Sequence, residues 1–502
     1  MPPPAGTTKR TSRHVDVLVV GAGISGVGAG WHLQHSFPGK TYAILEARSA
    51  VGGTWDLFRF PGVRSDSDMF TLSYPFHPWR RPESIGSGPA IRSYIEETAK
   101  AYGIDKAIHF GTRVRRATWS SRDARWTVEA VAGGRRQTWT CKFLYGCTGY
   151  YDYAGGYQPD WPGLADYRGR VVHPQKWPED LDLEGKRILV IGSGATAVTL
   201  VPALADAGAD VTMLQRSPSW VMTVGRRDPL AGLAERLSPA AAYSLLRTRN
   251  ALLTVGFFSM ARRRPQLARR ILRRAMAAIV GPEAVAEHFT PAYDPWTQRL
   301  CIAPEGDFLH ALADGRARIV TDQIDRFVTD GVRLTSGRVL KADVVVSATG
   351  LVLQPWGGVA LSVDGEDVDL GSCVVYRGCM LSGVPNLGFC VGYINASWTL
   401  RTELSHAFLC RVLAYLDDHG LASATPVPPA GMQTRPVLDL TSGYVLRGAD
   451  RFPKQGDREP WLLPQNWFLD RRGMARARVE QDMVFTRRSA PSVDQARARQ
   501  AS

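Results

Sequence analysis

The glycine spacing near the start of the chain is the pattern that binds a dinucleotide. Gly21, Gly23 and Gly26 lie in VDVLVVGAGISGVGAGWHL (15–33), which predicts a buried strand, a tight turn and a helix. Glycines at these places allow the turn, the close approach of a pyrophosphate to the backbone, and packing of the helix on the strand. The positive end of the helix, where Ser25 lies, then faces the phosphates.

An acidic residue after the next expected strand narrows the choice of ligand. The strand is TYAILEAR, and Glu46 near its end lies twenty residues beyond Gly26. A carboxylate at this place accepts hydrogen bonds from ribose hydroxyls and repels a 2′-phosphate. The first site is therefore predicted to take a dinucleotide with an unmodified adenosine ribose. The alternative is a glycine-rich turn without a ligand.

A second segment repeats this design. KRILVIGSGATAVTLVPAL (186–204) again predicts a strand, a turn and a helix. The residues of the turn and helix start are Gly192, Ser193, Gly194, Ala195, Thr196 and Ala197. The next strand, DVTMLQRSPSW, carries Gln215 and Arg216 near the place of the acid, followed by Ser217. A guanidinium holds a 2′-phosphate by forked, charge-assisted hydrogen bonds. The second site is therefore predicted to bind NADPH, and a surface arginine at a strand end is the alternative.

Two dinucleotide sites with opposite ribose preferences predict a flavoprotein that holds FAD and is reduced by NADPH. We expect an α/β fold with two Rossmann-like dinucleotide-binding domains. Segments 142–151 and 341–353 are expected strands that end in Thr-Gly turns and return the chain between the two halves. The expected parts are a disordered N-terminal tail (1–13), the first part of the FAD-binding domain (14–150), a linker (151–164), the NADPH-binding domain (165–345) with a helical insert at about 227–285, the returning FAD-binding part with substrate-pocket segments (346–487), and a disordered C-terminal tail (488–502).

The bulk composition argues against several other classes of protein. The seven cysteines include no C-x-x-C pair, which disfavours a disulfide framework, a zinc cluster and a disulfide reductase. The histidines form no H-x-x-x-H pattern, so no metal site is expected. The chain has neither an apolar signal segment nor an apolar run of about eighteen residues. We therefore expect a cytoplasmic protein that does not span a membrane.

The net charge of +14 is concentrated in one segment. Residues 226–274 hold twelve arginines and two acidic residues, which leaves +4 for the rest of the chain. An arginine-rich solvated helical face is the first explanation. Peripheral contact with anionic lipid, at the inner face of the membrane, is the second, because LLTVGFFSM (252–260) directly precedes Ala261 and three arginines. Nucleic acid is the third, but no recognition module supports it, and we expect no nucleic-acid partner.

One segment between the two glycine motifs carries a family resemblance. YRGRVVHPQKWP (167–178) resembles the fingerprint F-x-G-x-x-x-H-x-x-x-W-P of type I Baeyer–Villiger monooxygenases. Its matching residues are Tyr167, in place of Phe, Gly169, His173, Trp177 and Pro178. The stretches GGTWDLFRFPGVRSDSDM, DPWTQRLC and NASWTLR resemble the ethionamide-activating FAD monooxygenase subgroup of mycobacteria. Long-chain alkane- and ketone-oxidising flavin monooxygenases share several of these stretches.

The resemblance implies an NADPH- and O2-dependent oxidation of small apolar ketones to esters or lactones, and oxidation of sulfides or thioamides. It assigns the catalytic cation to Arg299, with Asp66 paired to it beside the flavin. A structural salt bridge is the alternative for these two residues. His173 is implied to couple the two domains through the linker. A packed, hydrogen-bonded linker residue is its alternative role.

Further cofactor contacts follow from the resemblance. The residues implied to contact FAD are Thr54, Trp55, Asp56, Asp66 and Val114, and those at the NADP site are Arg64 and Ser65 together with the second glycine turn, Arg216 and Ser217. Gln298 departs from the Lys of many relatives, which leaves Arg216 and Ser217 to hold the 2′-phosphate.

The substrate pocket and the exact reaction are less constrained. Trp398, Trp461 and Trp467 lie in segments that bind substrate in relatives, although core packing is the commoner role for tryptophan. An N- or S-oxygenating flavin monooxygenase is the first rival, and Trp177 disfavours it. A flavin-binding redox sensor or a membrane-attached scaffold is the second.

Overall fold

The computed structural model describes residues 12–230 and 238–487. The larger of its two main sheets is built on β1 (Ser12–Val20), which pairs in parallel with β2 (Tyr42–Leu45) and β8 (Arg135–Gly146). Alternate residues of β1 serve two cores, since Val17 and Val19 face one and Leu18 and Val20 the other. A strand that is buried on both faces needs this continuous apolar run.

The larger sheet combines a parallel centre with an antiparallel meander. Its order is β20-β19-β6-β7-β8-β1-β2-β5, and β23 also pairs with β8. The remaining strands are β5 (Ile108–His109), β6 (Thr112–Ser120), β7 (Arg125–Ala132), β19 (Ala360–Val363), β20 (Glu366–Asp367), β21 (Val375–Tyr376), β22 (Met380–Leu381) and β23 (Leu387–Phe389). The pairing of β23 with β8 shows that the chain returns to this sheet after leaving it.

The second sheet is entirely parallel and has the order β14-β11-β10-β18-β9. Its strands are β9 (Arg170–Val172), β10 (Arg187–Ile191), β11 (Asp210–Gln215), β14 (Ala317–Thr321) and β18 (Val344–Ser347). Beside it lie the pair β12 (Val221–Val224) and β13 (Cys301–Pro304) and the hairpins of β15 (Ile324–Val328), β16 (Gly331–Leu334) and β17 (Val339–Lys341). The α/β fold with two Rossmann-like units is confirmed.

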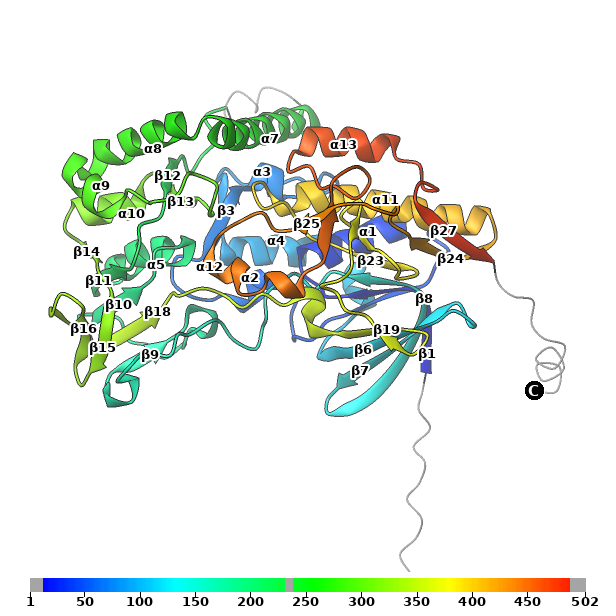
Figure 1. Cartoon of the computed structure of the whole chain (residues 1–502), viewed down its shortest axis with the longest axis horizontal. Helices are drawn as coiled ribbons and strands as arrows, with labels where there is room; N and C mark the ends of the chain where they lie inside the picture. Colours follow the sequence, from blue (N-terminus) through cyan, green and yellow to red (C-terminus); the bar gives the residue numbers. More distant parts are fainter. Residues whose placement is uncertain (1–11, 231–237, 488–502) are drawn as a thin grey trace, which may run out of the picture.

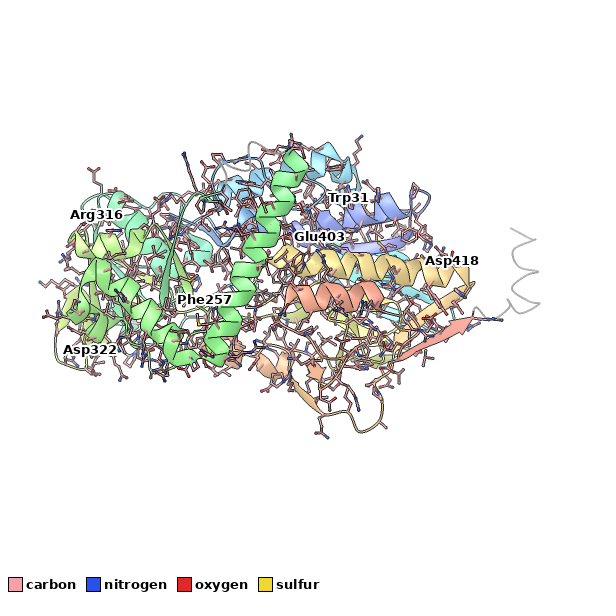
Figure 2. The ribbon with its side chains drawn as sticks, turned by 90° about the horizontal axis from the view of Figure 1, so that it is seen from above. Trp31, Phe257, Arg316, Asp322, Glu403 and Asp418 are labelled. Carbon is pink, nitrogen blue, oxygen red and sulfur yellow. The ribbon has the colours of Figure 1, made fainter. Side chains whose placement is uncertain are left out.

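Helices cover both sheets. In the larger unit α1 (Ile24–Ser36) packs against α11 (Trp398–Asp418), and Figure 2 shows Trp31 on α1 next to the helix that carries Glu403 and Asp418. In the second unit α5 (Ala195–Asp206) packs against α10 (Asp307–Ala313). The other elements of the larger unit are α2 (Thr54–Leu57), β3 (Arg64–Asp68), α3 (Met69–Leu72), β4 (Ile85–Ser87), α4 (Gly88–Ala101), β24 (Leu421–Pro426), β25 (Thr434–Pro436), α12 (Gly443–Leu446), β26 (Lys454–Gly456), α13 (Trp467–Arg476) and β27 (Met483–Arg487).

The arginine-rich insert forms α7 (Pro239–Arg263), α8 (Pro265–Val280) and α9 (Pro282–His288), so it ends slightly beyond the expected position 285. These helices run along one edge of the molecule (Figure 1). The insert does not contact the second unit alone, because α7 packs on α3 of the larger unit. Buried Arg247 donates hydrogen bonds to the carbonyls of Phe70, Thr71 and Ser73.

Two antiparallel segments connect the sheets. The residues after β8 pair with those after β18 through Asp152 N–H to Val352 O (2.8 Å) and Tyr157 N–H to Gly350 O (3.0 Å). The side chain of Gln175 donates to Asp152 O at 2.6 Å and ties this pair to the second unit. The two connections between the sheets are therefore hydrogen-bonded to each other, and we call this pair of segments, after β8 and after β18, the ribbon.

The structure corrects one boundary and leaves others outside its description. The expectation of a tail to residue 13 is wrong at its end, since β1 begins at Ser12 and pairs with Thr138 of β8. Residues 1–11 and 488–502, the rest of the two expected tails, lie outside the described residues, as do 231–237 of the insert. Within the described ranges, no helix has the length and apolar character needed to cross a bilayer.

Replacing Gly26 by Ala should weaken the larger unit and its FAD site. A Cβ at Gly26 would lie 1.9 Å from the carbonyl oxygen of Gly21, a backbone atom that cannot move aside without opening the turn. We expect a loss of about 1–3 kcal/mol of stability together with reduced flavin retention, measured by thermal unfolding and the flavin absorbance of the purified protein. The matched control is Gly39→Ala, where no atom lies within 4 Å of the added Cβ. Equal behaviour of the two variants would contradict this account of the turn.

Candidate functional site

A cavity of about 930 Å³ lies between the two units at the carboxyl ends of their central strands. Ligands of open parallel sheets bind at this edge, where the connections leave in opposite directions. The sequence-predicted residues that line it are Gly21, Gly23, Ser25, Glu46, Thr54, Trp55, Arg64, Ser65, Asp66, Val114, Gly192, Ser193, Gly194, Ala195, Thr196, Arg216, Ser217, Gln298 and Arg299. Those that do not line it are Gly26, Asp56, Ala197, Tyr167, Gly169, His173, Trp177 and Pro178.

The two glycine turns have the same construction. Gly21 has φ of +102°, and an added Cβ would lie 2.6 Å from the carbonyl oxygen of Cys147. Gly192 has φ of +139°, and its Cβ would lie 2.3 Å from the carbonyl oxygen of Ala348. Ala197, in the third position of the second motif, is buried in the core with its methyl group accommodated. Both turns therefore bring bare backbone to the cavity, as a pyrophosphate requires.

Glu46 fits the role of a ribose acceptor. Its Oε2 accepts a hydrogen bond from the N–H of Ala22 (2.7 Å) and its Oε1 from that of Arg48 (2.8 Å). Burial raises the pKa of this carboxyl, and the two backbone N–H groups oppose that effect. Each carboxylate oxygen retains a further lone pair, and the side chain lines the cavity. The residues of the first turn therefore fit a dinucleotide whose ribose is unmodified.

Of the three tryptophans considered for substrate contact, Trp398 reaches the cavity. Its Nε1 donates to the hydroxyl of Ser25 at 2.7 Å, and its ring stacks on Tyr150 with centroids 5.3 Å apart. Trp461 is fully buried against Tyr376 and donates to Asp482, and Trp467 is buried in a separate core. Of the three candidates for substrate contact, only Trp398 lies at the cavity.

Asp56 is not at the cavity surface, so the expectation of a direct FAD contact is wrong. Its carboxylate is 2% exposed and lies 2.6 Å from Arg48, 3.2 Å from Arg92 and 3.5 Å from Arg59. A carboxylate with three guanidinium partners is held in the protein by charge pairing. It fixes Arg48, whose backbone in turn holds Glu46.

Arg299 projects into the cavity among negative and aromatic groups. Its neighbours there are Tyr150, Tyr151, Tyr444 and Asp66. The phenolic oxygen of Tyr150 contributes most to raising the pKa of Arg299, and burial works in the opposite direction. Arg299 therefore carries its charge at every working pH. The three tyrosines come from the first connection and from α12, and the Tyr-Tyr doublet after the Thr-Gly turn was a signal for two of them.

Asp66 shares the cavity with Arg299 but does not form the expected direct ion pair. Among the described residues, no carboxylate oxygen lies within 4 Å of the Arg299 guanidinium. Asp66 is accessible to the cavity yet enclosed by protein, and this enclosure raises its pKa, while Arg299 and Arg64 lower it. Arg64 itself forms a two-point ion pair with Asp307 of α10, which joins β3 to the second unit.

The second turn presents a free guanidinium. Gln215 is 1% exposed, and its amide donates to His288 O and Thr321 Oγ1. Arg216, the next residue, is exposed at the cavity and has no carboxylate within 4 Å in the part of the chain that the structure describes. Ser193 Oγ donates to Ser217 O at 2.9 Å, which sets the loop beside the turn. These residues fit a dinucleotide that carries a 2′-phosphate.

Of the fingerprint residues, His173 contacts the connecting ribbon, whereas Tyr167 and Gly169 pack within the second unit. The hydroxyl of Tyr167 donates to Ala342 O at 3.0 Å, and a Cβ at Gly169 would lie 2.2 Å from that hydroxyl. Nε2 of His173 lies 3.3 Å from Gly350 O, and Nδ1 accepts from the N–H of Gln175 at 3.2 Å. Burial lowers the pKa of His173, which agrees with a neutral ring that donates at one nitrogen and accepts at the other.

Two family models match the chain, and both concern nucleotide-dependent redox proteins. The flavin-binding monooxygenase-like model matches residues 69–228, and the NAD(P)-binding Rossmann-like domain matches residues 19–97. Together they cover both glycine turns and the first of the two segments that connect the sheets.

The full-length comparisons agree. The chain is 47% identical to the FAD-containing monooxygenase EthA of Mycobacterium tuberculosis over 96% of this chain and 99% of that protein. It is 42% identical to the probable FAD-binding monooxygenase AlmA of Acinetobacter baylyi over 96% and 98%.

The solved structures confirm the fold. A steroid monooxygenase bound to NADP superposes with a TM-score of 0.73 at 22% identity over 94% of this chain and all of that one. Cyclohexanone monooxygenase from Rhodococcus sp. Phi1 bound to NADP+ gives 0.74 at 19%, over 95% and 100%. With the two dinucleotide turns and the fingerprint in place, the chain belongs to the FAD-containing, NADPH-dependent monooxygenases of the Baeyer–Villiger type.

Proposed function

We propose that this monooxygenase converts small apolar ketones into esters or lactones and also oxidises the sulfur of thioethers and thioamides. The observation that carries the proposal is the position of Arg299 in the cavity, among three tyrosines and close to both glycine turns. A fixed cation in an enclosed, partly apolar site stabilises negative charge that develops on a carbonyl oxygen. It gives no comparable help to the neutral amine nitrogen of an N-oxygenation substrate.

The residues of the chain have distinct duties in this proposal. The first glycine turn and Glu46 hold FAD, which when bound accepts a hydride and activates oxygen. The second turn and Arg216 hold NADPH, with Ser217 beside the 2′-phosphate. Arg299 is the catalytic residue that orients the substrate carbonyl and stabilises its oxygen. Asp66, on the cavity lining, partly compensates the positive charge of Arg299. Trp398 and Tyr150 stack on each other and form an aromatic wall that excludes water.

We propose that the fingerprint segment couples movement of the second unit to the ribbon. His173 and Gln175 belong to the second unit but bond to the ribbon between the units at Gly350 and Asp152. A movement of the second unit must therefore move the ribbon, whose residues Tyr150 and Tyr151 reach Arg299. His173 lies outside the cavity and is not assigned a proton-transfer role.

A peripheral contact with anionic lipid is part of the proposal for localisation, at the cytoplasmic face of a membrane. The outward face of α8 presents Leu267 and Ile271, 41% and 45% exposed, and α7 presents Leu252 and Leu253, 54% and 56% exposed. The exposed arginines with no carboxylate within 4 Å among the described residues are Arg263, Arg264, Arg270, Arg273 and Arg274. Apolar side chains flanked by unpaired cations favour an anionic bilayer surface.

The function is tested by measuring products and NADPH together. The holoenzyme is supplied with NADPH, oxygen and either a methyl ketone or a thioether, and the ester, sulfoxide and hydrogen peroxide are quantified. We expect ester formation to account for most of the NADPH consumed. Sulfoxide without any ester would favour the S-oxygenating rival, and peroxide as the sole product would favour an oxidase or sensor.

Replacing Arg299 by Ala should separate the consumption of NADPH and oxygen from the oxidation of the ketone. We expect ester formation to fall by about two to three orders of magnitude, as for loss of one group that stabilises an oxyanion, while peroxide becomes the main product. The matched control is Arg122→Ala, in an exposed turn that does not line the cavity. Retention of normal coupling in Arg299→Ala would remove the catalytic role.

Replacing Arg216 by Glu should change the choice between nicotinamide cofactors. Loss of charge-assisted hydrogen bonds costs about 1.5–3 kcal/mol, so KM for NADPH should rise roughly tenfold to a hundredfold. KM for NADH should change little, which serves as an internal control, and Arg338→Ala is the surface control. A parallel rise for both cofactors would show that Arg216 acts on the fold and not on the 2′-phosphate.

Membrane contact is tested by vesicle flotation. We expect the full chain to float with phosphatidylglycerol vesicles at low salt, less at high salt, and not with phosphatidylcholine. The double variant Arg270→Glu/Arg274→Glu should stay at the bottom, whereas Arg135→Glu/Arg136→Glu, a matched charge change in an exposed hairpin, should float normally. Flotation that is independent of the α8 arginines would contradict the proposal that this surface binds the membrane.

A further inference from the structure

A second, smaller cavity of about 60 Å³ lies behind the wall of the main one. The two cavities share Thr148, Gly149, Tyr150 and Tyr393 as lining residues. The smaller cavity is mostly apolar, but its lining also includes the thiol residue Cys390 and the buried ion pair of Arg401 with Asp470. A water molecule needs roughly 10–15 Å³ of such cavity volume, so a molecule the size of hydrogen peroxide fits.

The thiol of Cys390 is held by two groups that suit a thiolate. Its Sγ lies 2.9 Å from the hydroxyl of Tyr145 and 3.7 Å from Nδ1 of His406. The Tyr145 hydroxyl also lies 2.6 Å from the same Nδ1, so the three groups form one closed cluster. Arg401, on the cavity side, is paired with the carboxylate of Asp470 at 3.0 Å, so this charge is balanced within the lining. An imidazole beside the sulfur, with a hydroxyl group within hydrogen-bond distance, is the kind of surrounding that favours a reactive cysteine.

The titration of the cluster agrees with this geometry. Burial by itself raises the pKa of the Cys390 thiol, but contacts with Cys147, His406 and Tyr145 hold it well below its usual value. Burial lowers the pKa of His406, and its contact with Cys390 raises it above its usual value. Both shifts have a common cause, the contact between the Cys390 sulfur and the His406 ring.

A second cysteine is in place to complete a disulfide. Cys147 follows β8 and Cys390 follows β23, and the last paired residues of these parallel strands are Gly146 and Phe389. The N–H of Cys390 donates to Gly146 O at 2.8 Å, which keeps the strand ends together. Neighbouring strands lie about 4.8 Å apart, within the Cα separation of about 4.4–6.8 Å that a disulfide needs. Both thiols belong to the same core cluster, so they lie on the same face of the sheet.

We propose that Cys390 and Cys147 form a peroxide-reactive dithiol site beside the flavin cavity. The Cys390 thiolate attacks one oxygen of hydrogen peroxide, so an S–O bond forms, the O–O bond breaks, and hydroxide leaves with a proton from the Tyr145–His406 pair as water. The Cys147 sulfur then attacks the resulting sulfenic acid at Cys390. An S–S bond forms, the S–O bond breaks, and a second water leaves with the thiol proton. Two thiols are oxidised and one peroxide is reduced.

This site goes beyond the oxidation of ketones or sulfides. Hydrogen peroxide is the by-product of any flavin monooxygenase turnover that consumes NADPH without oxidising substrate, and the smaller cavity is next to its source. The segments that follow the two cysteines line the main cavity at Thr148 and Tyr393. The disulfide therefore restrains the wall of that cavity.

The test is disulfide and sulfenic-acid mapping on the full-length holoenzyme. The protein is treated with graded hydrogen peroxide, with catalase as the blank, and its cysteine peptides are analysed by mass spectrometry under non-reducing conditions. We expect a Cys147–Cys390 disulfide that dithiothreitol reverses, formed at least about tenfold faster than any oxidation of Cys373. Cys373 is a buried cysteine of a different core, whose Sγ donates to Asp369 O.

Two variants separate the steps. In Cys147→Ser the reaction should stop at sulfenic acid on Cys390, which dimedone traps, and in Cys390→Ser no sulfenic acid should form on Cys147. Cys373→Ser should behave as the unchanged protein. The proposal is overturned if peroxide oxidises the seven cysteines at similar rates, if Cys390 stays reduced, or if Cys390 pairs with Cys379. Because these readouts need no ketone, they are independent of the reaction proposed above.

Discussion

The architecture depends on two close contacts between a glycine turn and the backbone of a neighbouring strand end. Gly21 lies against the carbonyl of Cys147, and Gly192 lies against the carbonyl of Ala348. Each carbonyl belongs to the residue from which the chain leaves its sheet for the other one. Any side chain at either glycine would push the turn away from the start of the connecting ribbon. The two dinucleotide sites and the ribbon are therefore positioned by the same contacts, and the cavity lies between them.

The charged groups follow from this arrangement. The ribbon brings Tyr150 and Tyr151 to the cavity beside Arg299, which has no direct carboxylate partner among residues 12–230 and 238–487. A direct ion pair would neutralise the guanidinium and reduce its effect on a substrate oxygen. Asp66 lines the same cavity, where burial raises the pKa of its carboxyl and the nearby Arg299 lowers it. Arg64 is excluded from this role because Asp307 already holds it.

The dithiol site arises from the same strand ends. β8 supplies Cys147 and the first connection, and β23 supplies Cys390 and the segment that leads to Trp398. The core between α1 and α11 places His406 under these strand ends, so close to Gly28 that a Cβ there would lie 3.0 Å from its Nε2. The proposed dithiol site therefore borders the main cavity, which Cys147 itself lines.

The sequence by itself determined the class of fold, the two dinucleotide turns, the opposite charges of Glu46 and Arg216, and the fingerprint around His173. These features are local, because the spacing of glycines and the residue after a strand depend on a few consecutive positions. Only the tertiary structure decided that Asp56 faces three arginines away from the cavity, that Trp461 is core while Trp398 is wall, and that Cys147 and Cys390 are neighbours. Each of these depends on contacts between segments far apart in the chain, and a local sequence pattern does not indicate which distant residues are buried against one another.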